Sequence, residues 1–152
     1  MQERTLGGLS RDHRPKFKVV IIYEDGTAGK RAKHFYDKMM RELIGECDFN
    51  LELWSFRIIA ILEIGNSAAQ AAAKADFVIL SMHGKLELDA ATRNWIERWS
   101  RLIGDYYVPA LVVLVDQTET RGEKLTSTLR YLRKITNGKR INLYPNKNCL
   151  PL

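Results

Sequence analysis

The sequence predicts an α/β fold, a doubly wound, three-layer arrangement in which helices cover both faces of a five-stranded parallel sheet in the order 2-1-3-4-5. The chain has 152 residues, which is the length of one domain with one core. Several short aliphatic runs contain no polar residue, as is typical of strands buried on both faces. Segments with helical spacing separate these runs, and parallel neighbouring strands need such crossover connections.

Residues 17–23 predict the first strand, because a run of valines and isoleucines stops at an acidic turn, residues 24–26. Residues 28–46 then place apolar side chains three and four positions apart, with Lys and Arg between them. This spacing predicts an amphipathic helix that ends near Gly45.

The next segments predict an edge strand and a closely packed helix. Residues 49–56 alternate between two faces, which indicates a strand near the sheet edge. Residues 58–64 are ambiguous between helix and strand. The alanine-rich segment 68–75 predicts a helix that Asn66 and Ser67 cap and that packs close to the sheet.

A second continuous apolar run over residues 76–81 predicts the third strand. Residues 88–103 predict a helix with Asp89 as its N-cap. The apolar stripe of this helix consists of Ala91, Trp95, Trp99 and Leu102. We interpret both tryptophans as core side chains; the alternative is that an exposed part anchors a partner.

The last third of the chain predicts one more crossover. Residues 108–115 predict the fourth strand, residues 121–135 a basic amphipathic helix, and residues 140–145 a short last strand that Pro145 stops. The side chains of the helix expected to face inward are Leu125, Leu129, Leu132 and Ile135.

Positive charge is concentrated late in the chain. The sequence has 24 Lys and Arg against 18 Asp and Glu, a formal net charge of +6. Residues 121–147 contain eight basic residues and one acidic residue, so this segment accounts for the excess. Such a segment suits nucleic acid, an anionic membrane surface or an acidic protein partner. The simpler interpretation is a solvated helix face, because no nucleic-acid motif accompanies the charges.

The ends and the cysteines carry no predicted chemistry. Residues 1–15 have no periodicity and are expected to be a flexible leader before a single domain, residues 16–152. No apolar run suits a membrane span or a secretory signal, so we expect a cytoplasmic protein. Cys47 and Cys149 are expected to be free thiols, because two cysteines make neither a disulfide scaffold nor a zinc site.

The predicted strand order places the ends of the first and third strands side by side at the topological switch point, where such sheets bind ligands. We therefore expect a crevice between the loops that follow these two strands. Its expected ligand-binding residues are Glu24, Asp25, Gly26, Thr27, Gly29, Lys30, Ser81, His83 and Gly84. Glu24 and Asp25 are either a divalent-cation site or acceptors for backbone amides at the positive N-terminus of the next helix.

Residues at this crevice resemble those of a known family. The run Val20-Ile21-Ile22-Tyr23-Glu24-Asp25, followed by a helix that carries Arg31, resembles the opening of the receiver domains of bacterial response regulators, in which an acidic pair closes the first strand. Asp76-Phe77-Val78-Ile79-Leu80, after an alanine-rich helix, is similar to the receiver's approach to its phosphoacceptor aspartate. The resemblance covers residues 17–147 and implies the flavodoxin-like fold.

The resemblance also implies roles for single residues. Glu24 and Asp25 would be Mg²⁺ ligands, and Ser81 stands where the receiver carries its aspartate. Because serine offers no carboxylate, no aspartyl-phosphate forms there. The resemblance therefore implies a degenerate receiver that binds partners without phosphoryl transfer.

Two other interpretations of the first loop are less favoured. Residues 23–30 resemble a weakened flavodoxin phosphate turn, but only Thr27 supplies a hydroxyl, and the neighbouring carboxylates repel a phosphate. We therefore disfavour FMN. The spacing from Gly26 to Gly29 is too short for a P-loop, so ATP hydrolysis is disfavoured as well.

Hydrolase chemistry is the remaining option at the crevice. Ser81, His83 and an acid, Asp25 or Glu24, supply the residue types of a nucleophile, a base and an orienting group. No Gly-x-Ser-x-Gly turn surrounds the serine, so this interpretation is weaker than a loop hydrogen bond for His83.

Taken together, the sequence predicts a regulatory or binding domain rather than an enzyme, with no expected cofactor and Mg²⁺ as an option. A protein partner is favoured, and a homodimer is a further option. The expected partner contacts are Trp54, as an exposed side chain of the edge strand, and Arg130, Arg133 and Lys134 of the basic helix. The alternatives are a small flavodoxin-like enzyme or FMN-binding protein acting at the crevice, and nucleic-acid binding through the basic segment.

Overall fold

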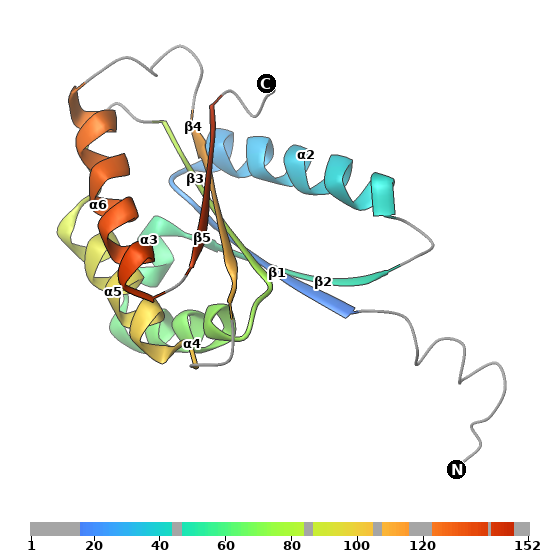
Figure 1. Cartoon of the computed structure of the whole chain (residues 1–152), viewed down its shortest axis with the longest axis horizontal. Coiled ribbons are helices and arrows are strands. Elements are labelled where there is room, and N and C mark those ends of the chain that lie inside the picture. The colour runs from blue at the N-terminus through green and yellow to red at the C-terminus, as the bar shows by residue number, and fades with distance from the viewer. Residues whose placement is uncertain are drawn as a thin grey trace, which may run out of the picture.

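Five parallel strands form one sheet in the order β2-β1-β3-β4-β5, which confirms the predicted topology (Figure 1). The strands are β1 (Lys16–Tyr23), β2 (Asp48–Ser55), β3 (Phe77–Met82), β4 (Ala110–Val115) and β5 (Asn142–Lys147). The helices are α2 (Gly26–Leu43), α3 (Phe56–Ile59), α4 (Leu62–Ala73), α5 (Ala90–Leu102) and α6 (Glu123–Lys139).

The structure, a computed structural model, describes residues 16–43, 47–83, 87–104, 108–115, 123–139 and 141–147. The predicted leader, Gly84 and Cys149 lie outside these ranges. Within the described residues, no helix combines the length and the apolar character that crossing a membrane requires.

The two faces of the sheet are covered unequally. Figure 1 shows α2 on one side of the sheet and α3 to α6 on the other. On the first side, Ala32 and Tyr36 of α2 form a small core with residues of β1, β3 and β4. On the second side, α4, α5 and α6 form a larger core with the same three strands. The strand β1 is fully buried between these layers over residues 19–22.

Trp95 and Trp99 lie in the larger core and are 1% and 0% exposed, as predicted. Their rings stack with centroids 6.3 Å apart. Their indole N–H groups donate to the carbonyl oxygens of Gly65 at 2.9 Å and Ala72 at 3.0 Å. Because each buried N–H finds an acceptor on α4, these two bonds fix α5 against α4.

The predicted stripe of α5 is wrong at both of its ends. Ala91 is exposed, and Leu102 is 46% exposed. The buried face consists of Thr92, Trp95, Ile96, Trp99 and Ser100, so it begins one residue later and ends two residues earlier than predicted. The predicted N-cap is confirmed, since Asp89 Oδ1 accepts from the Thr92 amide at 2.8 Å.

The start of α4 also differs from the prediction. The helix begins at Leu62, so Asn66 and Ser67 lie inside it and do not cap it. Its cap residue, Ile61, makes no side-chain cap bond. The buried face of α4 consists of small residues, namely Gly65, Ala68, Ala69 and Ala72. This face lets α4 pack closely against its neighbours. That packing stabilises helix at residues before the alanine-rich segment, which has the highest helix propensity.

Pro145 does not stop the last strand. The strand β5 runs from Asn142 to Lys147, with Pro145 opposite Val113 of β4. Because β5 is an edge strand, a residue without an N–H group is tolerated there. Helix α6 has the predicted type, and Leu132 is fully buried, with Leu129 and Ile135 packed against the larger core.

We expect Gly65→Ala to lower the free energy of unfolding by about 2 kcal/mol, because overpacking a closed contact forces the backbone to shift. A Cβ atom at Gly65 would collide with the carbonyl oxygen of Ile59. Gly138→Ala in α6 is the matched control, because nothing lies near its Cβ position. The control is expected to raise stability by up to about 1 kcal/mol. Urea unfolding followed by circular dichroism measures both; equal effects would contradict the close approach of α4.

Candidate functional site

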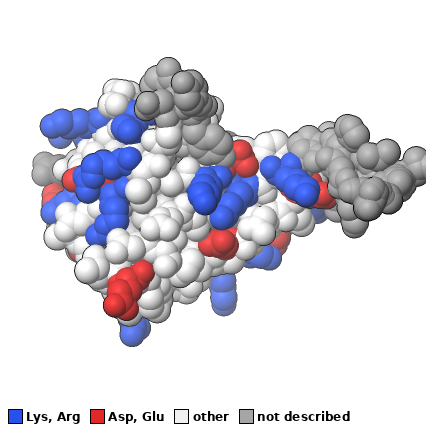
Figure 2. Space-filling view, turned by 90° about the horizontal axis from the view of Figure 1, so that it is seen from below, with Lys and Arg blue, Asp and Glu red and all other residues white. Residues whose placement is uncertain are grey.

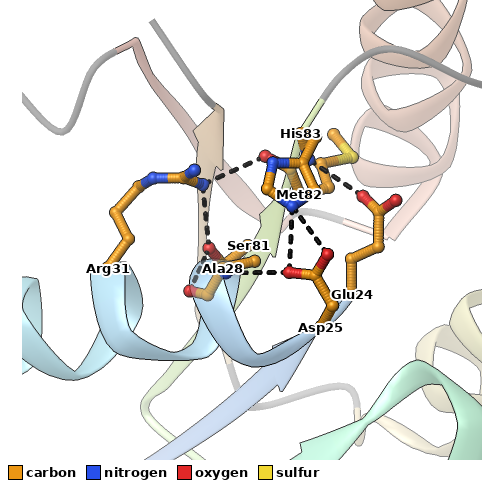
Figure 3. A network of polar contacts seen from close by, with 7 residues as sticks. All are labelled: Glu24, Asp25, Ala28, Arg31, Ser81, Met82 and His83. Atoms are coloured by element: carbon orange, nitrogen blue, oxygen red, sulfur yellow. Dashed lines mark hydrogen bonds and ion pairs between the residues drawn. The ribbon is translucent and has the colours of Figure 1, made fainter.

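The loops after β1 and β3 meet at the carboxyl edge of the sheet, as predicted (Figure 3). Tyr23 pairs with Ser81 in the parallel register of the two strands. The amide of Glu24 then donates to the carbonyl oxygen of Ser81 at 2.9 Å, so the backbone pairing continues one residue past β1. The side chains that follow are therefore held within hydrogen-bonding distance of each other.

Asp25 caps α2 and also binds His83. Its Oδ1 accepts from the Ala28 amide at 3.0 Å, which is N-cap geometry. The Nε2 atom of His83 lies 2.9 Å and 2.8 Å from the two carboxylate oxygens of Asp25. The Ala28 hydrogen bond is the main cause that lowers the pKa of Asp25 below its ordinary 3.8; burial opposes it, and His83 and the Thr27 amide add to it.

The side chain of Glu24 contacts the same histidine at its backbone amide. The Oε1 atom of Glu24 accepts from the His83 amide at 2.9 Å. Both acidic side chains thus accept hydrogen bonds from backbone amides of the chain. Only Asp25 does so at the N-terminus of the next helix, as one interpretation of the pair expected, because the donor to Glu24 is the His83 amide. Figure 3 shows the two carboxylates on either side of the His83 residue.

The donor set fits Mg²⁺ poorly. Within the described residues, no three His, Cys, Asp or Glu side chains come together as a metal site. A cation shared by Glu24 and Asp25 would compete with the His83 ring for the Asp25 carboxylate. The hydroxyl of Ser81 is already directed at a carbonyl oxygen.

Ser81 is 0% exposed and links β3 to the first turn of α2. Its Oγ donates to the Ala28 carbonyl oxygen at 2.7 Å. The guanidinium of Arg31 lies 3.4 Å from Ser81 Oγ and donates to the Met82 carbonyl oxygen at 3.1 Å. The nucleophile and base of the disfavoured hydrolase alternative do not contact each other, because the Ser81 hydroxyl donates to a backbone carbonyl oxygen and the His83 Nε2 atom faces Asp25.

The remaining residues of the first loop form the start of α2. Gly26, Thr27 and Lys30 are exposed there. Gly29 is buried against the ring of Tyr23. A Cβ atom built on Gly29 would lie 3.0 Å from the nearest atom of that ring. The amides at this helix N-terminus serve the Asp25 carboxylate, so they are not directed at an external phosphate.

A cavity of about 400 Å³ opens at the same edge, on the side of the sheet opposite α2. We call it the carboxyl-edge cavity; it is lined by Glu24, Phe56, Arg57, Ala60, Met82, Glu87, Leu88 and Asp89. Of the predicted ligand-binding residues that the structure describes, only Glu24 lines it. A second cavity, of about 360 Å³, lies at the opposite, amino edge of the strands, where α4 and α5 end.

Sequence reasoning missed the part of the cavity that follows β2 and the part that precedes α5. The predicted order already placed β2 beside β1, so residues 56–60 had to begin at this edge. Asp89 was predicted as the N-cap of the helix after the third strand. Because that helix starts at the carboxyl edge of the sheet, its N-cap lies near the ligand position at this edge. These two signals place both segments at this edge, whereas the cavity between them depends on how the loops pack.

The predicted partner contacts lie on different surfaces. Trp54 is half-buried against the larger core, since it pairs with Ile22, and its Nε1 donates to Glu52 Oε1 at 3.2 Å. The prediction that Trp54 is an exposed side chain of the edge strand is therefore wrong, whereas Leu53 beside it is 44% exposed. The basic side chains of α6 expected as contacts are all exposed, namely Arg130, Arg133 and Lys134. In the face that Figure 2 shows, Lys and Arg stand in separate groups with Asp and Glu between them.

The strand order and the helices on both faces define a flavodoxin-like α/β fold. No protein-family profile and no curated protein sequence matches the chain. Among solved structures, the chain is similar to the capsular polysaccharide assembling protein CapF from Staphylococcus aureus, with a TM-score of 0.56 and 16% identity. The match covers 86% of this chain and 33% of CapF, so the chain spans a third of that protein's length.

The chain is also similar to the Trp repressor binding protein from Bacillus subtilis, with a TM-score of 0.50 and 8% identity. This match covers 86% of this chain and 84% of the other. At these identities, both likenesses concern the fold.

Asp25→Asn tests the charge at the cap. Because the folded-state pKa of Asp25 is lowered, its carboxylate stabilises the fold above pH 3.8, and this contribution is lost as the pH falls through the lowered pKa. Asparagine still caps the helix. We therefore expect the wild type to be more stable than the variant at neutral pH, and the difference to shrink in strong acid.

Urea unfolding of both proteins at neutral and strongly acidic pH measures this difference. Asp37→Asn removes one negative charge from the same helix and is the control, because Asp37 pairs only with exposed Lys33 in the structure. A difference for Asp25→Asn that stays constant down to strong acid would contradict the assigned role of the carboxylate.

Ser81→Ala tests the link between β3 and α2. Loss of the hydroxyl removes the buried hydrogen bond that joins β3 to the Ala28 carbonyl oxygen of α2, so we expect a loss of about 1 kcal/mol in unfolding free energy. Ser100→Ala is the matched control, since Ser100 is also buried and donates to a carbonyl oxygen, that of Glu97 in its own helix. Alanine favours that helix, so the control is expected to change stability by less than about 0.5 kcal/mol. Equal effects in the unfolding assay would refute the link.

Proposed function

We propose that this chain is a non-catalytic regulatory or binding domain, receiver-like in form but without phosphoryl transfer. The observation that supports the proposal most strongly is the environment of Ser81. At the end of β3, where the resemblance expects a phosphoacceptor carboxylate, a serine is fully buried and directs its hydroxyl at Ala28. A phosphate donor in solution does not reach this side chain.

The contacts between the two loops suggest how binding is transmitted. Glu24, Asp25 and Arg31 each contact the end of β3 or His83 just beyond it. A partner that binds at this edge alters the balance of these contacts and so shifts the loops between arrangements. The exposed basic side chains of α6 then provide a second surface for a macromolecule, an acidic protein being favoured over nucleic acid.

The structural neighbours share the fold of this chain, and one of them is titled a Trp repressor binding protein. At 8% identity no residue role carries over, and the proposal for this chain depends on its own crevice residues.

Incubation with acetyl phosphate and Mg²⁺ tests the absence of phosphoryl transfer. We expect intact-mass spectrometry to find the chain unmodified, because no exposed carboxylate stands at the end of β3. A receiver domain with its aspartate, treated in the same tube, is the positive control. Stoichiometric phosphorylation of this chain, or a visible flavin absorbance in the purified protein, would contradict the proposal.

A further inference from the structure

The carboxyl-edge cavity has an apolar floor and a charged rim. Met82 and Leu88 are 2% and 6% exposed and form the floor together with half-buried Phe56. Its volume, about 400 Å³, lies within the range of ligand pockets, about 300–1,000 Å³. An apolar floor of this kind binds the aliphatic part of a guest.

The rim of the cavity is acidic, although the chain as a whole is basic. Among the lining residues that the structure describes, Glu24, Glu87 and Asp89 contribute three carboxylates and Arg57 contributes one guanidinium. The formal net charge of the whole chain is +6. Two of these carboxylates accept hydrogen bonds from the backbone, Glu24 from the His83 amide and Asp89 from the Thr92 amide. The rim therefore repels anions and attracts an organic cation.

Three large aliphatic side chains that are close in sequence to the cavity lining are exposed on the surface. Ile58 of α3, Ile61 before α4 and Leu62 at the start of α4 are 40%, 51% and 63% exposed, and they follow the lining residues Phe56 and Arg57 along the chain. We call these three residues the aliphatic patch. Contiguous exposed apolar side chains are typical of protein–protein contacts. Binding of a free small cation does not require such an exposed apolar surface.

We propose that the carboxyl-edge cavity receives the Arg or Lys side chain of a partner polypeptide, whose neighbouring apolar residues cover the aliphatic patch. This inference rests on the proposed function, since it names the partner chemistry of the same edge. Charge complementarity selects the cationic side chain, the apolar floor takes its methylene stem, and the patch selects a polypeptide over a free amine.

Amide chemical shifts in two-dimensional NMR spectra of the full chain test the inference with defined probes. The probes are the peptide acetyl-Leu-Arg-Leu-amide, its counterpart with Gln in place of Arg, butylguanidine and valerate. We expect saturable shifts at the cavity amides with the Arg peptide, at least about tenfold weaker binding of the Gln peptide, and no binding of valerate. Butylguanidine is expected to bind the same amides about tenfold more weakly than the Arg peptide, because it lacks the apolar neighbours.

Variants separate the contributions of the rim and the patch. Glu87→Gln is expected to weaken the Arg peptide and butylguanidine about fivefold, whereas Glu63→Gln, an exposed glutamate of α4 outside the cavity, leaves both unchanged. Arg57→Gln removes the repelling cation and is expected to strengthen both. Leu62→Ser is expected to weaken the peptide alone. All four positions are exposed, so the variants are expected to fold.

Equal binding of the Arg and Gln peptides, binding of valerate, or equal effects of Glu87→Gln and Glu63→Gln would overturn the inference. An unchanged affinity of the Arg peptide for Leu62→Ser, with butylguanidine still bound, would also overturn it and assign the cavity to free cations. None of these results bears on phosphorylation by acetyl phosphate. A failure of the inference is therefore distinguishable from a failure of the proposed function.

Discussion

The pairing of β1 with β3 is the constraint on which the rest of the structure depends. Because β1 is buried on both faces, each of its backbone N–H and C=O groups needs a partner in a neighbouring strand. That requirement fixes β2 on one side and β3 on the other, in parallel register. It also brings the ends of β1 and β3 together, so the residues after them interact whatever their identity. The contacts at the carboxyl edge are therefore a consequence of how the backbone of β1 forms its hydrogen bonds with β2 and β3.

The two sides of this edge have opposite character. On the side of α2, the polar groups bind each other: Asp25 serves the helix amides and His83, and Ser81 serves Ala28. On the side of α3 and α5, the carboxyl-edge cavity opens, and carboxylates line it around an apolar floor. A closed network beside an open cavity suits binding better than bond-making chemistry, because the groups with reactive protons are engaged within the chain while the accessible surface offers charge and apolar area.

Much of this arrangement could be predicted from the sequence, because aliphatic runs and crossover helices determine a parallel sheet almost by themselves. The crevice position and the caps Asp25 and Asp89 follow from the same logic. What could not be predicted depends on tertiary packing. The glycine and alanine face of α4 becomes a packing surface only when Trp95 and Trp99 cover it, and Pro145 is tolerated only because β5 lies at an edge. The cavity escaped prediction because its lining combines three loops, whereas the prediction combined two.

The identity of residue 81 follows from hydrogen-bond chemistry at a buried position. The Ala28 carbonyl oxygen is an acceptor and lies 2.7 Å from the side chain, so the residue there has to donate a proton. A serine does so, whereas an ionised carboxylate has no proton to donate and would place two acceptors in contact inside a buried site. The guanidinium of Arg31 adds a contact to Ser81 Oγ and donates to the Met82 carbonyl oxygen. The contact between β3 and α2 thus requires a hydrogen-bond donor at residue 81, and an ionised acid does not fit there.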